Sequence, residues 1–599
     1  MARTWAEIKK LKPTMVERRL IRACRKGEPC KLGDDRPEGA DPARTIRADI
    51  LRYLILGGCD GCRTHEWGAQ LLGGYIDGEL DLSFATARGA IILADCRFAR
   101  PPRLIYAKLE ILTLHGSALP GLNAQGIQVT GTVFLRNGFS AEGRVSLSGA
   151  TIGGQLDCTE GRFQNSDGHA LNAEGIQVTG SVFLHNGFTA KGEVRLSAAT
   201  IGGQLDCDGG HFQNSDGSAL NAQGIQVTGS VFLRNGFTAE GGVSLAAATI
   251  GGQLACTGGR FQNSDGHALN TEGIQVTGDV LLSNGFSAEG EVSLSGATIG
   301  GQLGCEGGTF QKSNGNALIA QRLRVTEGFL WRKASVPQGT IYLASAHVGD
   351  LVDDLQSWPE GGRIYLDGFT YDRISAAFTD SRERLEWLKR GTVWNDEFFP
   401  QPYAQLAKML REMGHDRGAR DVLVEQGQLI RLHAYRRAQK AGSIGQMLYP
   451  ARLLWSALQR WIVGYGYKPF RSVIAAGLLW IIATGLGYKA WDSNAMVPNS
   501  DVILTSPGWQ ALADQPGPAK NWTAEGAPGQ DWEVFNSLAW GFDVVVPIIQ
   551  VGQIEAWAPS TTRGFWGQAA WWGRWGLSVA GWVVIALATA AVTGIIRRE

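Results

Sequence analysis

The chain has 599 residues, enough for two or more domains, and its 81 glycines far exceed the average share of about 7%. Its 56 basic and 56 acidic residues cancel, which excludes a protein that binds nucleic acid or membranes through its overall charge; any basic surface has to be local. The glycines recur periodically, which favours a repeat architecture over a disordered chain.

The N-terminal stretch, MARTWAEIKKLKP, has no apolar core and does not read as a secretory signal. We expect the large N-terminal part to stay in the cytosol, where the nine cysteines remain reduced. Residues 1–72 are predicted to form a helical cap, because the segment from Ala43 to Leu56 carries apolar residues at helical spacing.

Cysteine and histidine residues in this cap have a spacing that zinc sites use. Cys59, Cys62 and His65 are close in sequence, and Cys24 and Cys30 precede them. The upstream pair is not spaced as a close knuckle. Buried free thiols are therefore the favoured interpretation, and we expect neither a metal site nor a cofactor.

From Gly126 the sequence repeats almost verbatim with a period of 49 residues. GIQVTG begins at 126, 175, 224 and 273, and IGGQL at 152, 201, 250 and 299. A weaker half-repeat, offset by 23 residues, makes each unit two similar coils. Short alternating runs between Gly, Asn, Ser and Asp turns read as strands. The pattern predicts a mainly β fold, a right-handed β-solenoid over residues 73–375 that is most regular over 126–321.

One apolar position of the repeat is a cysteine, occupied by Cys158, Cys207, Cys256 and Cys305. If each repeat is two coils, neighbouring cysteines lie about 10 Å apart, beyond the roughly 7 Å reach of a disulfide. We therefore expect an internal stack of small apolar side chains.

Two lines of basic side chains are predicted on the outside of the solenoid, because a solenoid turns a repeat position into a line in space. The first line consists of Arg136, His185 and Arg234, and the second of Arg162, His211 and Arg260. Each presents a cation about every 10 Å, which suits a polyanion such as a nucleic-acid backbone. The other interpretation is that these residues only keep the outward faces soluble.

Helical patterns follow the solenoid. Residues 376–442 predict a helical hairpin, with two amphipathic helices joined at Met413-Gly414-His415, and residues 443–472 predict a membrane-proximal helix. Residues 473–599 predict a transmembrane domain with spans at about 473–490 and 575–596, each near the roughly 20 residues needed to cross a bilayer. Lys and Arg gather before the first span and follow the second as Arg597 and Arg598, so both termini and the solenoid are predicted to be cytoplasmic.

Between the spans, residues 532–553 are apolar but interrupted by Asp543 and Pro547. Two interpretations remain open: a re-entrant pore loop, or an interfacial helix that packs the two spans. Two spans cannot enclose a pore in one subunit, so a channel has to be a homo-oligomer. The polar candidates for its pore are Asn536, Asp543, Gln550, Gln553 and Glu555.

No arrangement of residues predicts an enzyme. The glycine-rich runs lack the order and the lysine of phosphate-binding loops, and Ser, His and Asp in NSDGHA are too close in sequence to form a triad. The favoured function is an oligomeric membrane ion channel with a solenoid sensor and scaffold. The alternatives are a non-conducting membrane-anchored scaffold and, less favoured, a membrane-associated oxidoreductase.

Several motifs resemble a bacterial family of two-span β-solenoid membrane proteins: IGGQLxCxGGxF coils, FFPQPYAQLAKMLREMGHDRGARDVL, WIVGYGYKPFRSV and NSLAWGFDVVVPIIQVGQIEAWAP. The arrangement is also similar to the membrane effectors of Hailong anti-phage systems. That resemblance implies a homotetrameric channel of the inner membrane, acting in antiviral defence by abortive infection. It further implies that single-stranded DNA oligomers, made by a partner nucleotidyltransferase, hold the channel shut.

Overall fold

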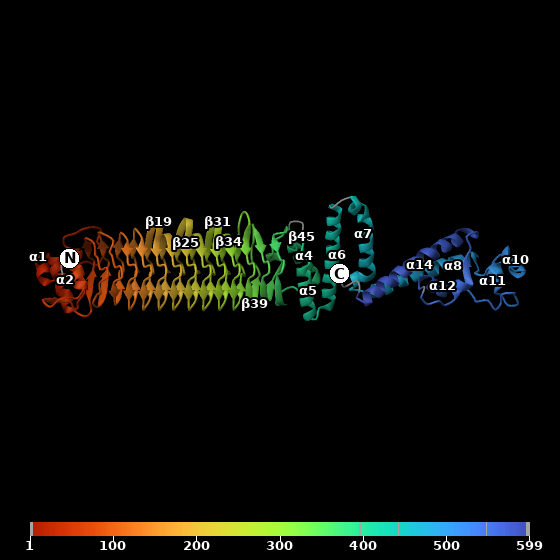
Figure 1. Ribbon diagram of the computed structural model, residues 1–599, viewed down its shortest axis with the longest axis horizontal. Helices are drawn as coiled ribbons and strands as arrows, with labels where there is room; N and C mark the ends of the chain where they lie inside the picture. Colours follow the sequence, from red (N-terminus) through yellow and green to blue (C-terminus); the bar gives the residue numbers. More distant parts are fainter. Residues whose placement is uncertain (1–3, 395–396, 441–442, 547, 595–599) are drawn as a thin grey trace. The chain divides into compact units, whose positions relative to one another are not determined.

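The computed structural model describes residues 4–394, 397–440, 443–546 and 548–594. The chain forms two compact units, Met1–Gln405 and Leu406–Glu599. The first is dominated by strands and the second by helices (Figure 1).

A β-solenoid of about 13 turns makes up most of the first unit, as the repeats predict. Val133 pairs in parallel with Leu156 of the next coil, and Leu156 pairs in parallel with Val182 of the coil after that. A shorter and a longer coil thus alternate within each repeat. One repeat contains the strands β13 (Gln128–Val129), β14 (Val133–Phe134), β15 (Ser140–Ala141), β16 (Val145–Ser146), β17 (Thr151–Ile152), β18 (Leu156–Asp157) and β19 (Arg162–Asn172).

The longer coils contain a bulge. Where β19 pairs with β22 (Thr189–Arg195), the register shifts between Gln164 and His169. The Asn165 side chain closes this bulge by donating a hydrogen bond to the carbonyl of His169, at 2.9 Å. The same feature recurs in β25 (His211–Asn221) and β31 (Arg260–Asn270), and the bulges project from one side of the solenoid (Figure 1). The NSDG segments therefore lie in these bulges and lengthen every second coil.

Two stacks in the interior are formed by phenylalanines and by the repeat cysteines with intervening leucines. Successive phenylalanine rings lie 5.2 to 5.3 Å apart along the stack of Phe139, Phe163, Phe188, Phe212, Phe237, Phe261, Phe286 and Phe310. The four repeat cysteines are buried and free, as expected. Hydrogen bonds place Leu184 on the coil between Cys158 and Cys207, so a leucine separates these neighbouring cysteines. Burial raises the pKa of the Cys158 and Cys207 thiols well above the usual range.

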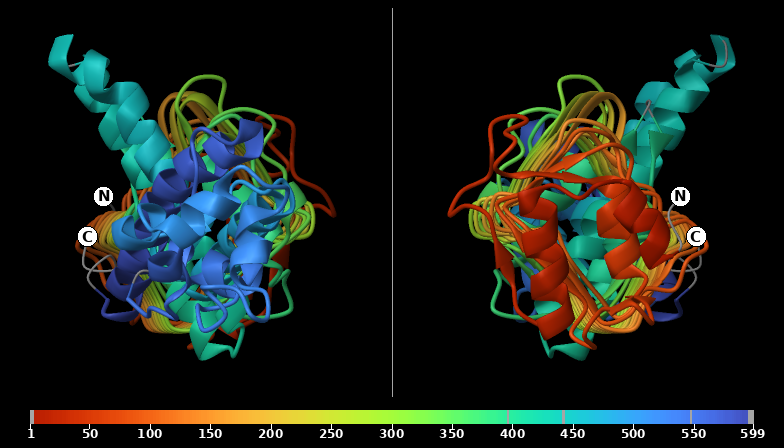
Figure 2. Two further views of the ribbon diagram at one scale, coloured as in Figure 1. Left: turned by 90° about the vertical axis from the view of Figure 1, so that its right-hand side faces the viewer. Right: turned by 90° about the vertical axis from the view of Figure 1, so that its left-hand side faces the viewer.

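Helices cover the N-terminal end of the solenoid (Figure 2). They are α1 (Trp5–Lys10), α2 (Met15–Lys26) and α3 (Ala48–Ile55). Leu20, Ile50 and Leu54 are fully buried, so these helices shield the open end of the coil stack. The helix predicted from Ala43 begins later, because Thr45–Arg47 forms a strand, β2, that pairs with β6 (Tyr75–Asp77).

The aromatic stack continues into the C-terminal end of the first unit, through Trp331 and Trp358 to Trp387 of α4 (Ser381–Gly391). Arg384 of α4 makes a fully buried ion pair with Asp353, at 2.7 Å. Helix α4 therefore belongs to the first unit and closes its solenoid, whereas the sequence assigned this region to the helical hairpin.

The hairpin helices are α5 (Gln401–Glu412), which crosses the boundary between the units, and α6 (Asp416–Lys440). They join at Met413 to His415, where Gly414 has a φ of 83°. Helix α7 (Ser443–Val463) occupies the predicted membrane-proximal segment and leads through a short 3-10 turn, Gly464–Gly466, to the remaining helices.

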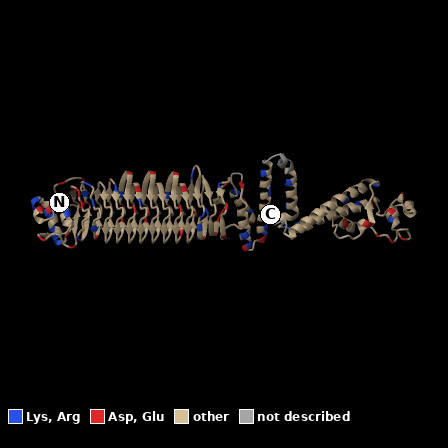
Figure 3. Ribbon diagram, in the orientation of Figure 1, with Lys and Arg blue, Asp and Glu red and all other residues tan. Residues whose placement is uncertain are grey.

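Two helices, α8 (Phe470–Asp492) and α14 (Gly564–Val592), are long and apolar enough to cross a membrane. Only 17% of the most apolar stretch of α8 and 22% of that of α14 are buried within the chain, which is unlike the core helix of a soluble protein. Charged residues are sparse along both (Figure 3). Helix α14 begins at Gly564, ahead of the predicted span, whose last residues, with Arg597 and Arg598, lie outside the described part of the chain.

Small elements connect α8 to α14. They are β46 (Met496–Pro498), α9 (Asp501–Leu504), α10 (Pro507–Ala513), α11 (Pro518–Trp522), α12 (Ser537–Val545), α13 (Gln553–Ala556) and β47 (Trp557–Pro559). Strands β46 and β47 pair antiparallel, so the segment that follows α8 and the segment that precedes α14 lie side by side.

Candidate functional site

The segment between α8 and α14 folds back on itself. The indole of Trp557 donates a hydrogen bond to the carbonyl of Glu533, at 2.7 Å, and the indole of Trp532 donates to the carbonyl of Ala556, at 3.2 Å. The two ends of the segment therefore adjoin. Between them, α12 has nine residues and is about 13 Å long, less than half the thickness of a hydrocarbon core.

Close packing through glycine holds α12 between α8 and α14. Trp540 is fully buried against Gly487 of α8, where a Cβ atom would lie 2.7 Å from the indole. Gly541 faces Thr484 so closely that a Cβ atom there would lie 2.5 Å from the hydroxyl. On the other side, the Ser578 hydroxyl of α14 donates to the carbonyl of Val544, at 2.9 Å. Such contacts between small residues are typical of helices packed in membranes.

Asp543 holds the loop that follows α12. Its side chain is only 5% exposed and accepts hydrogen bonds from three backbone N–H groups, those of Val551 at 2.5 Å, Gln553 at 2.7 Å and Ile554 at 3.2 Å. The carboxylate thus joins the end of α12 to the returning chain. In a single subunit it is directed at backbone rather than at solvent.

The other polar candidates divide into two groups. Gln553 is buried and bridges the two ends of the segment, accepting from the Asn536 N–H at 2.9 Å and donating to the Val534 carbonyl at 3.1 Å. Asn536 is exposed, and its side chain caps the first turn of α12. Gln550 and Glu555 are exposed.

The tip of the loop is apolar, which the sequence-based list of polar candidates did not include. Ile548, Ile549 and Val551 are 65%, 57% and 50% exposed, on either side of Gln550. Pro547 lies outside the described residues. The sequence shows the apolar residues on both sides of Gln550. Their exposure could not be predicted from it, because exposure depends on how the loop folds.

Acidic residues of neighbouring coils neutralise the first basic line. Arg136 pairs with Asp157 at 2.7 Å and Arg234 with Asp208 at 2.8 Å. Both guanidinium groups also lie over phenylalanine rings, and His185 contacts the Thr159 hydroxyl at 3.3 Å. The two carboxylates lie on the coils between those that carry the basic residues. Comparing only positions that are one full repeat apart therefore does not reveal these ion pairs.

The second basic line has hydroxyl groups between its cations. Strand pairing places Thr189 between Arg162 and His211, and Thr238 between His211 and Arg260, so this line is continuous. In the described part of the chain, no carboxylate lies within 4 Å of Arg162 or Arg260, and both are exposed. This line retains the chemistry that a polyanion needs.

The cap residues with zinc-like spacing lie in a hairpin, in which Cys59 of β3 (Gly58–Cys59) pairs with Cys62 of β4 (Cys62–Arg63). His65 accepts a hydrogen bond from the backbone N–H of Trp67, at 3.2 Å. Within the described residues, no three His, Cys, Asp or Glu side chains are grouped as a metal ion requires.

The two features that stand out are therefore the returning segment between the apolar helices and the second basic line on the solenoid. Comparisons of the chain with protein-family models, curated proteins and solved structures found no match.

Proposed function

We propose that the chain is one subunit of an oligomeric ion channel, in which the segment 532–553 forms the inner part of the pore. The observation that carries this proposal is the fold of that segment. Its two ends adjoin, its helix α12 is wedged between α8 and α14, and its loop ends in exposed residues. A non-helical loop at membrane depth has to be covered by protein or face water.

Oligomerisation satisfies this requirement, because equivalent loops from several subunits meet around a common axis. Ile548, Ile549 and Val551 then form an apolar constriction, with Gln550 as its polar group. Apolar constrictions gate ion flow by excluding water. The resemblance to Hailong effectors favours four subunits in a bacterial inner membrane, with the termini and solenoid in the cytoplasm.

The solenoid serves as the sensor in this proposal. Arg162, His211 and Arg260 provide an unneutralised basic line, and the gating ligand is a nucleotide or a single-stranded oligonucleotide made by a partner nucleotidyltransferase. Ligand binding biases the channel between closed and open states only through a difference in affinity for the two. The resemblance implies that the ligand-bound channel is the closed one.

The test is planar-bilayer recording on the purified full-length protein, with and without single-stranded oligonucleotides. We expect conductance without ligand and its reduction when oligonucleotide is added on the solenoid side. Absence of conductance in both conditions would overturn the channel and favour a non-conducting scaffold. Conductance that ignores the oligonucleotide would overturn only the sensor.

A further inference from the structure

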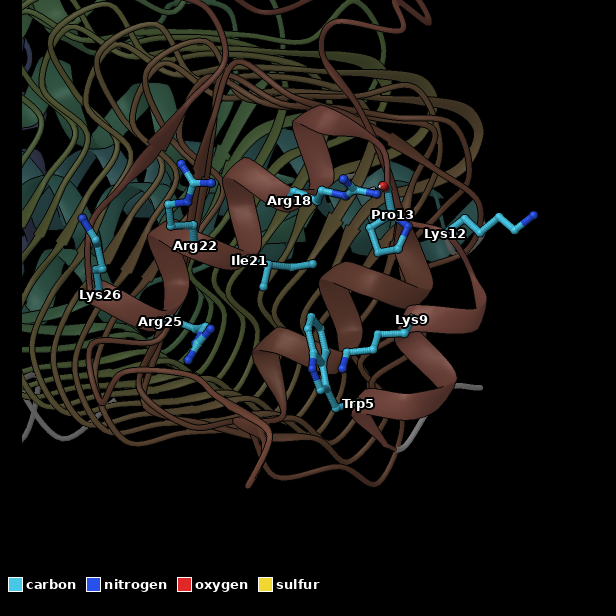
Figure 4. A pocket seen from close by; sticks show the side chains of 9 residues that line it. All are labelled: Trp5, Lys9, Lys12, Pro13, Arg18, Ile21, Arg22, Arg25 and Lys26. Atoms are coloured by element: carbon cyan, nitrogen blue, oxygen red, sulfur yellow. Dashed lines mark hydrogen bonds between the residues drawn. The ribbon is translucent and has the colours of Figure 1, made fainter.

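A basic pocket lies in the N-terminal cap, in addition to the site described above. It has a volume of about 800 Å³ and is lined by Trp5, Lys9, Lys12, Pro13, Arg18, Ile21, Arg22, Arg25 and Lys26. Helix α1 contributes Trp5 and Lys9, and helix α2 contributes Ile21 and Arg25 (Figure 4). Six of the nine lining residues are cationic and none is acidic.

The spacing along α2 explains why its pocket-lining arginines lie on one side of the helix. Arg18, Arg22 and Arg25 lie at positions i, i+4 and i+7 of this helix, on one face. Ile21 is buried beside them and gives this face an apolar floor. The opposite face of the helix packs on the solenoid end through residues such as Leu20 and Cys24.

Like charges so arranged oppose the stability of the helix. Lys26 has a carboxylate partner, Glu28, at 3.8 Å, but within the described chain no carboxylate lies within 4 Å of Arg18, Arg22 or Arg25. Arg25 and Lys26, in the last turn, complement the helix dipole, whereas Arg18 is near the N-terminus, where a cation is unfavourable. The dipole therefore does not account for the whole cluster, and a bound anion would.

The aromatic residue of the pocket, Trp5, indicates which class of anion could bind. The Lys9 ammonium lies over one face of the Trp5 ring, 5.5 Å from its centre, and both residues line the pocket. An indole beside an apolar floor provides a surface for a flat ring, and arginines bind phosphate through paired N–H groups. A nucleoside phosphate combines a flat ring with an anion.

We propose that this pocket binds a nucleoside phosphate, either as a free nucleotide or as the phosphorylated end of an oligonucleotide. The base stacks on Trp5, and Arg18, Arg22 and Arg25 hold the phosphate. Only an effect of this ligand on gating rests on the proposed function. Binding itself does not, because it can be measured without a membrane.

The experiment is calorimetric titration of the full-length protein in detergent. Its probes are dATP, deoxyadenosine, inorganic triphosphate and a short single-stranded DNA with or without a 5′-phosphate. We expect dATP to bind more tightly than either deoxyadenosine or triphosphate. If the source is an oligonucleotide end, the 5′-phosphorylated DNA binds more tightly than the unphosphorylated DNA.

Variants assign the binding to the pocket. Arg22→Glu together with Arg25→Glu should weaken the preferred phosphorylated probe by at least about tenfold, as the loss of charge-assisted hydrogen bonds predicts. Trp5→Ala should weaken dATP but leave triphosphate unchanged. Arg19→Glu is the matched control, since Arg19 is exposed on the same helix but does not line the pocket. Thermal unfolding checks that each variant is folded.

Two outcomes overturn the proposal. One is an affinity of the double variant equal to that of the wild-type protein while the variant remains folded. The other is no binding of either phosphorylated nucleoside probe at millimolar concentration. Because no conductance is measured, both outcomes are distinct from failure of the channel.

Discussion

At the residue scale, Asp543 shows how an acidic side chain becomes part of a loop rather than of a solvent-filled passage. Its two oxygens accept from three backbone N–H groups that have no helical or strand partner in this loop. These hydrogen bonds compensate for the burial of the side chain in an apolar setting.

Replacement of Asp543 by Asn should destabilise the second unit. The side-chain amide replaces an acceptor with a donor, so a buried backbone N–H group loses its partner, at a cost of about 1–3 kcal/mol. The measurement is the thermal unfolding midpoint of the detergent-solubilised protein. Glu555→Gln, at an exposed position of α13, should have no comparable effect. Equal midpoints for Asp543→Asn and wild type would contradict this role.

A second residue-scale prediction concerns thiol reactivity. Cys59 is the partly exposed cysteine of the nine, and the Tyr53 hydroxyl, 3.0 Å from its sulfur, lowers the pKa of this thiol. The other eight are buried, and burial raises the pKa of Cys96 to about 12. Thiolates are the reactive species, so maleimide should label Cys59 first in the folded protein. Mass spectrometry before and after denaturation measures this, and early labelling of Cys158 would contradict the buried stack.

At the scale of elements, glycines determine how closely α12 approaches its neighbours. Gly487, Gly541 and Gly581 each lie where a Cβ atom would collide with Trp540, Thr484 or the carbonyl of Val545. The helix is therefore held in place by shape on both sides, with hydrogen bonds from Trp480 and Ser578 to its backbone carbonyls.

Gly541→Ala should destabilise this arrangement, although alanine favours helices by about 1 kcal/mol over glycine. The added methyl would have to displace backbone and side-chain atoms of Thr484. Gly485→Ala, in α8 with open space around it, is the control and should be neutral or stabilising. Unfolding midpoints compare the two; an equal gain in both variants would contradict close packing at Gly541.

The two basic lines should differ in their binding of single-stranded DNA. Replacing Arg162 and Arg260 with Glu should weaken binding more than replacing Arg136 and Arg234, because Asp157 and Asp208 already neutralise the latter pair. The loss should also reduce the dependence of affinity on salt. Filter binding at several salt concentrations measures both effects, and equal losses from the two pairs would contradict a role specific to the second line.

At the scale of the whole molecule, repetition determined which features the sequence could predict. The repeat is nearly verbatim, so the solenoid and its buried cysteines followed from spacing alone. The ion pairs of Arg136 and Arg234 did not, because their partners lie on adjacent coils, which match these coils only through the weaker half-repeat. The two apolar helices were predicted by length and composition.

The candidate site was harder to predict, because it depends on how the chain closes on itself. Asp543 was identified from its position in an apolar segment, but its partners are backbone groups, which leave no mark in the sequence. The solenoid cap at Trp387 and Arg384 was missed for a similar reason, since their partners are distant in the chain.

The most direct test of the channel asks whether Gln550 faces an ion path. Gln550→Cys should conduct in planar bilayers and lose most of its conductance when a charged thiol reagent is added on the side opposite the solenoid. Val502→Cys, at an exposed position of α9 outside the segment 532–553, is the control and should be insensitive. Conductance unaffected by modification of Gln550→Cys, or no conductance from the wild-type protein, would contradict a pore formed by this segment.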